Sequence, residues 1–121
     1  HYPAFQRMLQ AGAWIQLTSG SLTGRYGPRP KYWSERILDE GLCHILATDA
    51  HHIDRRPPLL AEAREVASRR LGSEEATHLV VTRPQGIIDN TPPAALPALP
   101  DAVVQKAARP FWRGLFGRKP H

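Results

Sequence analysis

The sequence predicts an α/β fold in which parallel strands are covered by helices. Two short apolar segments have the composition of strands, and a segment with helical periodicity separates them. The second of these segments, Cys43 to Thr48, is apolar on both faces, as is required of a strand buried between helices. Strands that alternate with helices form right-handed βαβ units with parallel pairing.

The first forty residues are expected to alternate between helix and strand. Residues 2–11 carry apolar side chains at helical spacing, and Gly12 is suited to end that helix. Residues 13–18 form the first expected strand, and a loop rich in glycine and serine follows over 19–28. The next helix is expected over 30–40.

Two helices are expected after the second strand. The first opens at Pro57, since proline is tolerated in a first turn, and closes at Gly72. The second begins beside Ser73, a typical N-cap residue, and runs to about Val81, with one more turn over 84–89. Two strands alone make a poor sheet, so this segment is expected to belong to a larger one.

The composition changes at about residue 90. Residues 1–90 are expected to form the folded part, and residues 91–121 a Pro-rich linker with a basic tail. The tail holds five of the 16 basic residues and one of the 11 acidic residues, so it carries +4 of the net charge of +5. The body therefore lacks the basic footprint of a nucleic-acid-binding protein. Phe111, Trp112 and Phe116 could contact a membrane surface or a partner, although disorder is the commoner state of such tails.

The single cysteine, Cys43, excludes a disulfide within the chain and favours a reducing, cytoplasmic compartment. No apolar run is long enough to span a membrane, and no signal peptide is visible. Because the chain begins with His1 rather than methionine, it is expected to be a fragment of a longer protein.

Asp49 and His51 are the main candidates for chemistry, because they directly follow the buried strand. Ligands of parallel α/β proteins gather at the carboxyl ends of strands. In an extended segment, residues two apart point to the same side, so this carboxylate and imidazole could reach one metal ion such as Zn, Mn or Fe. Alternatively, Asp49 caps a turn and His51 is solvated. His52 is expected to point away, and Arg56 could either clamp a phosphate or remain solvated.

Two further segments contain residues of a kind found in phosphate sites. Residues 19–27 could present amides and hydroxyls to an anion, but they match no phosphate-binding motif, and a flexible loop is an equal alternative. A cysteine phosphatase needs an arginine six residues after its nucleophile, and here that residue is Asp49. Cys43 also lies in an apolar strand, where a thiolate is disfavoured, so it is expected to be a core residue.

Residues 2–90 resemble the C-terminal half of the bacterial CpsB/YwqE-type tyrosine-protein phosphatases, which belong to the polymerase and histidinol phosphatase (PHP) superfamily. The resemblance is carried by the order and spacing of four segments. These segments are Gln16-Leu-Thr-Ser-Gly-Ser-Leu-Thr-Gly-Arg-Tyr-Gly27, Leu42-Cys-His-Ile-Leu-Ala-Thr-Asp-Ala-His51, Arg56-Pro-Pro58 and Leu60-Ala-Glu-Ala63.

The resemblance implies part of a distorted β/α barrel with a metal cluster, usually manganese, at the strand ends. It matches Asp49 and His51 to the family's last metal ligands and Arg56 to an arginine that binds phosphate. The implied reaction is hydrolysis of phosphotyrosine on a bacterial capsule or exopolysaccharide tyrosine kinase by a metal-activated water. The family's His-x-His and His-Pro-Glu-Arg motifs are absent here, so the chain alone is expected to be inactive and prone to associate through open barrel edges.

Two other functions are also compatible with the sequence. The first is a PHP-type phosphoesterase that acts on a small metabolite. The second is a non-catalytic, truncated module whose tail docks to a membrane or a partner protein.

Overall fold

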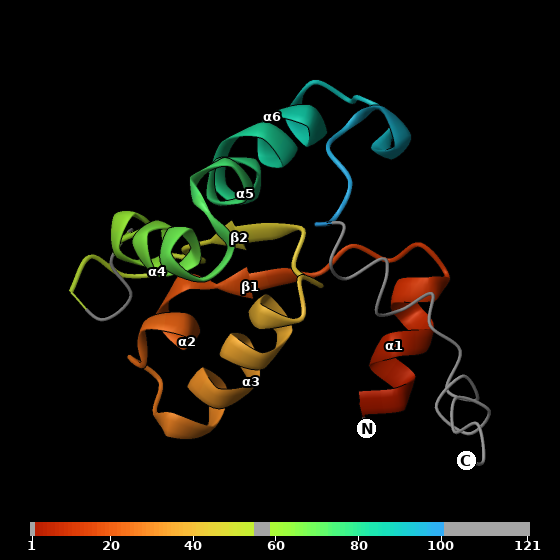
Figure 1. Ribbon diagram of the computed structural model, residues 1–121. Helices are drawn as coiled ribbons and strands as arrows, with labels where there is room; N and C mark the ends of the chain where they lie inside the picture. Colours follow the sequence, from red (N-terminus) through yellow and green to blue (C-terminus); the bar gives the residue numbers. More distant parts are fainter. Residues whose placement is uncertain (1, 55–58, 101–121) are drawn as a thin grey trace, which may run out of the picture.

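The computed structural model describes residues 2–54 and 59–100 of the chain. These residues form a mostly helical structure with one small parallel sheet. In Figure 1 the two strands lie at the centre, with α2 and α3 on one side and α5 and α6 on the other. The expected α/β class with parallel strands is confirmed, and the described residues contain two strands rather than a closed barrel.

The sheet consists of β1 (Gln16–Thr18) and β2 (Ile45–Ala47). The strands pair in parallel, and their last residues, Thr18 and Ala47, lie side by side. Both strands therefore end on the same side of the sheet, which we call its carboxyl end. The opposite side, where both strands begin, is called its amino end.

Helices and turns make up the rest of the described structure. In chain order they are α1 (Tyr2–Gln10), α2 (Ser19–Thr23), α3 (Pro28–Asp39), α4 (Ala61–Leu71), α5 (Ser73–Thr77), the π turn η1 (His78–Thr82), α6 (Arg83–Ile88) and the 3₁₀ turn η2 (Pro93–Ala95). None of the helices in the described part has the length and apolar character needed to cross a membrane.

One core joins the strands to α2, α3, α4, α5 and η1. Its buried side chains are Leu17, Leu22, Leu38, Cys43, Leu46, Ala63, Ala67, Ala76 and Leu79. Burial of each leucine contributes about 1.5–3 kcal/mol relative to an exposed position. Ala63 and Ala67 lie one helical turn apart on α4, and their small side chains let this helix approach its neighbours closely.

The segment expected to be a loop over 19–28 is instead helical in its first half. Leu22 is buried in the core, which explains why the backbone turns into α2 directly after β1. Thr23 donates its hydroxyl to the Ser19 carbonyl at 3.1 Å, and Gly24 ends the helix with a left-handed φ of 88°. The loop is therefore confined to residues 24–27, and α3 begins two residues earlier than expected.

The expected helix from Ser73 and the expected turn over 84–89 form one continuous run that contains a π turn. The Arg83 N–H bonds to the His78 carbonyl, five residues earlier. In a regular helix the ring of Pro84 would clash with the carbonyl four residues earlier, and the wider π turn ahead of it relieves this crowding. Helix α4, which ends before Gly72, begins at Ala61. This is later than the expected start at Pro57, a residue that lies outside the described residues.

Helix α1 lies beside α3 and has no buried residue (Figure 1). The ring of Tyr2 stacks on Trp33 with centroids 6.1 Å apart, and the Arg36 guanidinium carbon lies 4.4 Å above the Tyr2 ring. The Tyr2 hydroxyl also donates to the Glu40 carboxylate. Trp33 is 41% exposed and packs on Tyr2 of α1 rather than in the core.

Residues 96–98 contact the body of the structure. A Cβ atom added to Gly86 would come within 2.3 Å of the Leu96 side chain, so Leu96 packs directly on the backbone of α6. The carbonyls of Pro97 and Ala98 accept hydrogen bonds from Arg83. The division at residue 90 and the role of the tail stay predictions, because residues 101–121 lie outside the described residues.

Candidate active site

Asp49 and His51 follow β2 at the carboxyl end of the sheet, as expected. Both side chains are exposed. The His51 Nδ1 atom lies 2.6 Å from the Asp49 carbonyl oxygen and 3.8 Å from its carboxylate oxygen Oδ1. The structure thus brings the two predicted ligands together at one point.

The geometry that joins them differs from the predicted one. The prediction assumed an extended strand end, but Asp49 has a φ of 49°, in the left-handed region. Aspartate tolerates this conformation better than most residues, because its short side chain can bond locally. A turn therefore folds His51 back toward Asp49, and an alternating strand does not account for their proximity.

The donor atoms of this pair suit a divalent metal such as manganese or zinc. A carboxylate oxygen and an imidazole nitrogen are both common ligands of these ions. However, the described residues contain no group of three or more His, Cys, Asp or Glu side chains that could hold a metal ion. The pair fits part of a metal site, and further ligands would be needed to complete it.

The other predicted site residues have different outcomes. Arg56 lies outside the described residues, as do Phe111, Trp112 and Phe116. His52 is exposed, and its Nδ1 atom accepts a hydrogen bond from the Asp54 N–H at 3.1 Å. These observations leave the phosphate-binding role of Arg56 a prediction.

Cys43 is a core residue, as predicted. It is 1% exposed, and its Sγ–H donates to the Ile45 carbonyl at 3.1 Å. Burial raises the pKa of the thiol to about 12. The thiol stays protonated at neutral pH, so it cannot act as the nucleophile of a cysteine phosphatase.

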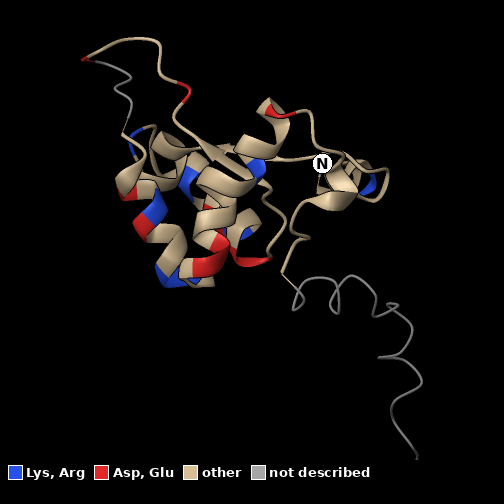
Figure 2. Ribbon diagram, turned by 90° about the horizontal axis from the view of Figure 1, so that it is seen from above, with Lys and Arg blue, Asp and Glu red and all other residues tan. Residues whose placement is uncertain are grey.

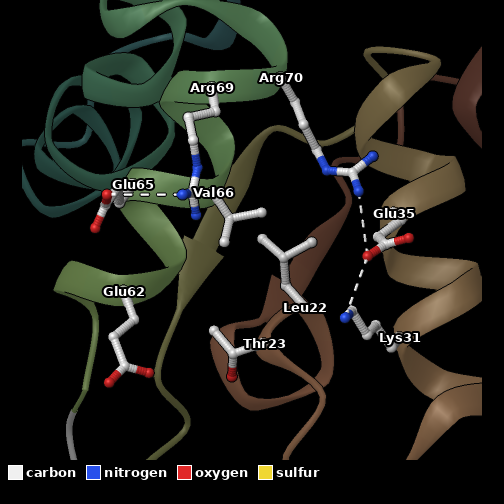
Figure 3. A pocket seen from close by; sticks show the side chains of 9 residues that line it. All are labelled: Leu22, Thr23, Lys31, Glu35, Glu62, Glu65, Val66, Arg69 and Arg70. Carbon is white, nitrogen blue, oxygen red and sulfur yellow. Dashed lines mark ion pairs between the residues drawn. The ribbon is translucent and has the colours of Figure 1, made fainter.

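A groove of about 580 Å³ runs between α4 and the pair formed by α2 and α3 (Figure 3). Leu22 and Val66 contribute apolar surface to it. On the α3 wall, the Glu35 carboxylate oxygen Oε1 lies 3.8 Å from Lys31 Nζ and 3.2 Å from Arg70 Nη2. Because both cations share one acid, this wall is poorly suited to bind a phosphate.

Acidic and basic residues are interspersed along the described helices rather than gathered by sign (Figure 2). The exposed pair of Arg69 and Glu65 on α4 is typical, with 3.8 Å between Nη1 and Oε1. Arg70 makes the best exposed contact, because its Nη1 atom donates to both carboxylate oxygens of Asp39 at 2.8 and 2.7 Å. The Arg70–Asp39 pair links α4 to α3, whereas the Arg69–Glu65 pair lies within α4.

The amino end of the sheet holds a buried guanidinium, that of Arg83, which is not among the residues predicted from the sequence. Arg83 is 0% exposed and forms a bidentate pair with Glu75, at 2.7 and 3.3 Å. It also donates to the carbonyls of His44, Pro97 and Ala98 at 3.2, 3.0 and 2.9 Å. Every nitrogen of the guanidinium is engaged, so the side chain is a structural clamp with no donor left for a ligand.

His44 continues this clamp at the start of β2. Its Nδ1 atom accepts a hydrogen bond from the Ile15 N–H at 3.0 Å, and its ring stacks on Trp14 with centroids 4.9 Å apart. Burial, together with the nearby charge of Arg83, lowers the pKa of His44 to about 4. The imidazole is therefore neutral near pH 7, which its role as an acceptor requires.

Comparison with known proteins identifies a family to which this chain is similar. Residues 1–89 match the family model described as capsular polysaccharide synthesis, CpsB/CapC. The chain is 31% identical over 90 residues to the tyrosine-protein phosphatase CpsB of Streptococcus agalactiae serotype V. This alignment covers 70% of this chain and 37% of the length of that protein.

Two other relatives cover shorter stretches. The tyrosine-protein phosphatase YwqE of Bacillus subtilis is 39% identical over 67 residues, or 55% of this chain and 26% of that protein. The putative tyrosine-protein phosphatase CapC of Staphylococcus aureus is 36% identical over 55 residues, which are 46% of this chain and 22% of that protein. The aligned part of this chain thus spans no more than 37% of the length of these relatives.

Proposed function

Because the chain belongs to the CpsB/CapC family of capsular polysaccharide synthesis proteins, we propose that it carries part of the active site of a metal-dependent protein-tyrosine phosphatase. The observation that carries this proposal is the meeting of Asp49 and His51 at the carboxyl end of the sheet. The names of the relatives from Streptococcus agalactiae and Bacillus subtilis support the reaction class.

In this proposal, β1 and β2 are two strands of a larger PHP-type β/α barrel. Their parallel pairing and short length support the idea, since a two-stranded sheet is marginal without neighbours. Active sites of such barrels lie at the carboxyl ends of the strands. The remaining strands and ligands would come from the part of the relatives' length that the match leaves uncovered.

Asp49 and His51 would hold one side of the metal site through a carboxylate oxygen and an imidazole nitrogen. The His51 Nδ1 atom lies 2.6 Å from the Asp49 carbonyl oxygen, and this contact limits rotation of the ring. A bound metal, for which we propose manganese, would supply a water of lowered pKa as the nucleophile. Arg56 would bind the phosphate oxygens and offset their negative charge.

The proposed substrate is phosphotyrosine on a bacterial tyrosine kinase of the capsule pathway, in the cytoplasm. The alternatives are a small phosphorylated metabolite and a docking module without activity. Side-by-side turnover of a phosphotyrosine peptide and of histidinol phosphate separates them. Equal or faster hydrolysis of the metabolite would favour the first alternative.

The activity itself is tested with the full-length protein on p-nitrophenyl phosphate in the presence of Mn²⁺. We expect Asp49→Ala and His51→Ala each to lower kcat/KM by more than about 100-fold, because each removes a metal ligand. Asp89→Ala, which removes an exposed carboxylate at the end of α6, is the matched control and should keep full activity. Full activity in either ligand variant would rule out the assignment.

A further inference from the structure

The loop that follows α2 folds back to the carboxyl end of the sheet. Gly24 has a left-handed φ of 88°, and the Arg25 N–H donates to the Gly20 carbonyl at 2.9 Å. Gly20 comes two residues after Thr18, the last residue of β1. The hydrogen bond therefore holds Arg25 and the residue after it close to the point where β1 ends.

Tyr26 lies directly on the backbone of Gly20. A Cβ atom added to this glycine would come within 2.8 Å of the Cε2 and Cζ atoms of the Tyr26 ring. The ring thus occupies the space that a side chain at position 20 would fill. Tyr26 nevertheless keeps 37% of its surface exposed.

The strand register relates this ring to the candidate active site. Thr18, the last residue of β1, lies beside Ala47, the last residue of β2. Gly20 comes two residues after Thr18, and Asp49 comes two residues after Ala47. The ring of Tyr26 and the pair of Asp49 and His51 are therefore presented at the same end of two adjacent strands. The loop is also the first irregular segment after β1, the usual position of substrate-contacting residues in barrel enzymes.

The chemistry of this loop suits an aromatic phosphate monoester. An exposed tyrosine ring can stack on the ring of a substrate, and an alkyl group gains less from such a contact. Arg25 beside it is exposed and forms no ion pair within residues 2–54 and 59–100, so its charge can attract a dianionic substrate.

We propose that Tyr26 sets the preference of this site for aryl over alkyl phosphate monoesters, by stacking on the ring that carries the phosphate. This inference rests on the proposed function, because it assigns a specificity residue to the same site. Gly20 is its positioning residue, since a side chain there would displace the tyrosine ring.

Binding of two non-hydrolysable ligands tests the proposal in the full-length protein with Mn²⁺. Calorimetry gives the dissociation constants of phenylphosphonate and methylphosphonate, and their ratio measures the aryl preference without turnover. We expect Tyr26→Leu to reduce this ratio by about 3- to 10-fold, the range of one aromatic contact, and Tyr26→Phe to retain it. Gly20→Ala should reduce the ratio as well, with Tyr26 intact.

Tyr32→Leu is the matched control, because Tyr32 is also exposed but contacts Trp33 edge-on at 5.3 Å. It should leave the ratio unchanged. Circular dichroism confirms that each variant is folded. An unchanged ratio in folded Tyr26→Leu would overturn the inference.

The kinetic outcome separates this inference from the proposed function. Hydrolysis of phosphate monoesters by the wild-type protein without any aryl preference would overturn the role of Tyr26 and leave a metal-dependent phosphoesterase activity standing, with the small metabolite favoured as its substrate. Failure of the wild-type protein to hydrolyse any monoester with Mn²⁺ would overturn the phosphatase proposal, and this inference with it.

Discussion

The two ends of the small sheet differ in how completely their polar groups are engaged. At the amino end, Arg83 is fully buried and bonded to Glu75 and to three carbonyls, and His44 is held neutral beside it. At the carboxyl end, Asp49 and His51 are exposed and meet in a turn with a left-handed residue. The amino end, where the donors of Arg83 are all engaged, stabilises the fold. The carboxyl end, where Asp49 and His51 are exposed, retains groups that can bind a ligand.

This division matches a general property of parallel α/β proteins. Residues at the amino ends of their strands serve stability, and residues at the carboxyl ends serve chemistry. Strain and exposure at the carboxyl end reduce stability locally, so the rest of the fold must offset them. The buried contacts at the amino end of this sheet are suited to that role.

The largest expected effect on stability follows loss of the clamp at the amino end. Arg83→Met should lower the free energy of unfolding by about 3–5 kcal/mol, because it leaves the Glu75 carboxylate buried without its partner. Urea unfolding followed by circular dichroism measures the change. Arg69→Met breaks the exposed pair with Glu65 and should cost less than about 0.5 kcal/mol. Equal costs would show that burial of Arg83 is not what stabilises this end.

A smaller effect is expected from acid. The pKa of His44 is about 4 in the folded protein and 6.5 in the unfolded chain. Above pH 6.5 both states are neutral at this residue, and its contribution is complete. As the pH falls from 6.5 to about 4, the unfolded chain takes up a proton that the folded protein excludes, so stability falls.

We expect this loss to be about 1–2 kcal/mol, because the ring is only partly buried and water weakens the effect. Urea midpoints of the wild-type protein and of His44→Gln, measured at pH 7 and at pH 4.5, isolate it from the titration of acidic residues. The variant should lose less stability than the wild type between the two pH values. The same loss in both would exclude His44 as the source.

The smallest effect concerns the left-handed residue at the carboxyl end. Asp49→Gly should raise the free energy of unfolding by about 0.5 kcal/mol, since glycine adopts a positive φ without strain, while it removes phosphatase activity. Asn90, with a φ of 54°, is the matched position away from the site. Asn90→Gly should give a similar gain and leave activity unchanged. Loss of stability in Asp49→Gly alone would mean that the Asp49 carboxylate supports the fold.

The sequence locates both strands, because their apolar runs are bounded by polar and glycine-rich segments, but each strand spans only three residues of its expected six. It also places Asp49 and His51 at the correct end of β2, since strand direction alone determines this. It does not predict α2, because Ser19-Gly20-Ser21 has loop composition and only the burial of Leu22 makes this segment helical. Here tertiary packing overrides local propensity.

The sequence also does not reveal the clamp at Arg83. Glu75 and Arg83 are eight residues apart, a spacing that places both on one face of a helix, and this was the available signal. The π turn between them and the return of Pro97 and Ala98 to the same guanidinium depend on contacts between distant segments. Periodicity within one helix cannot report such contacts.

The difference between the two ends is tested most directly by measuring stability and activity together in two variants of the full-length protein. We predict that His51→Ala loses at least about 100-fold in kcat/KM with an unfolding free energy within about 0.5 kcal/mol of the wild type. We predict that Arg83→Met loses several kcal/mol of stability but retains its kcat/KM at temperatures where it is folded. A His51→Ala protein that keeps its activity, or a folded Arg83→Met protein that loses it, would contradict the separation of the two ends.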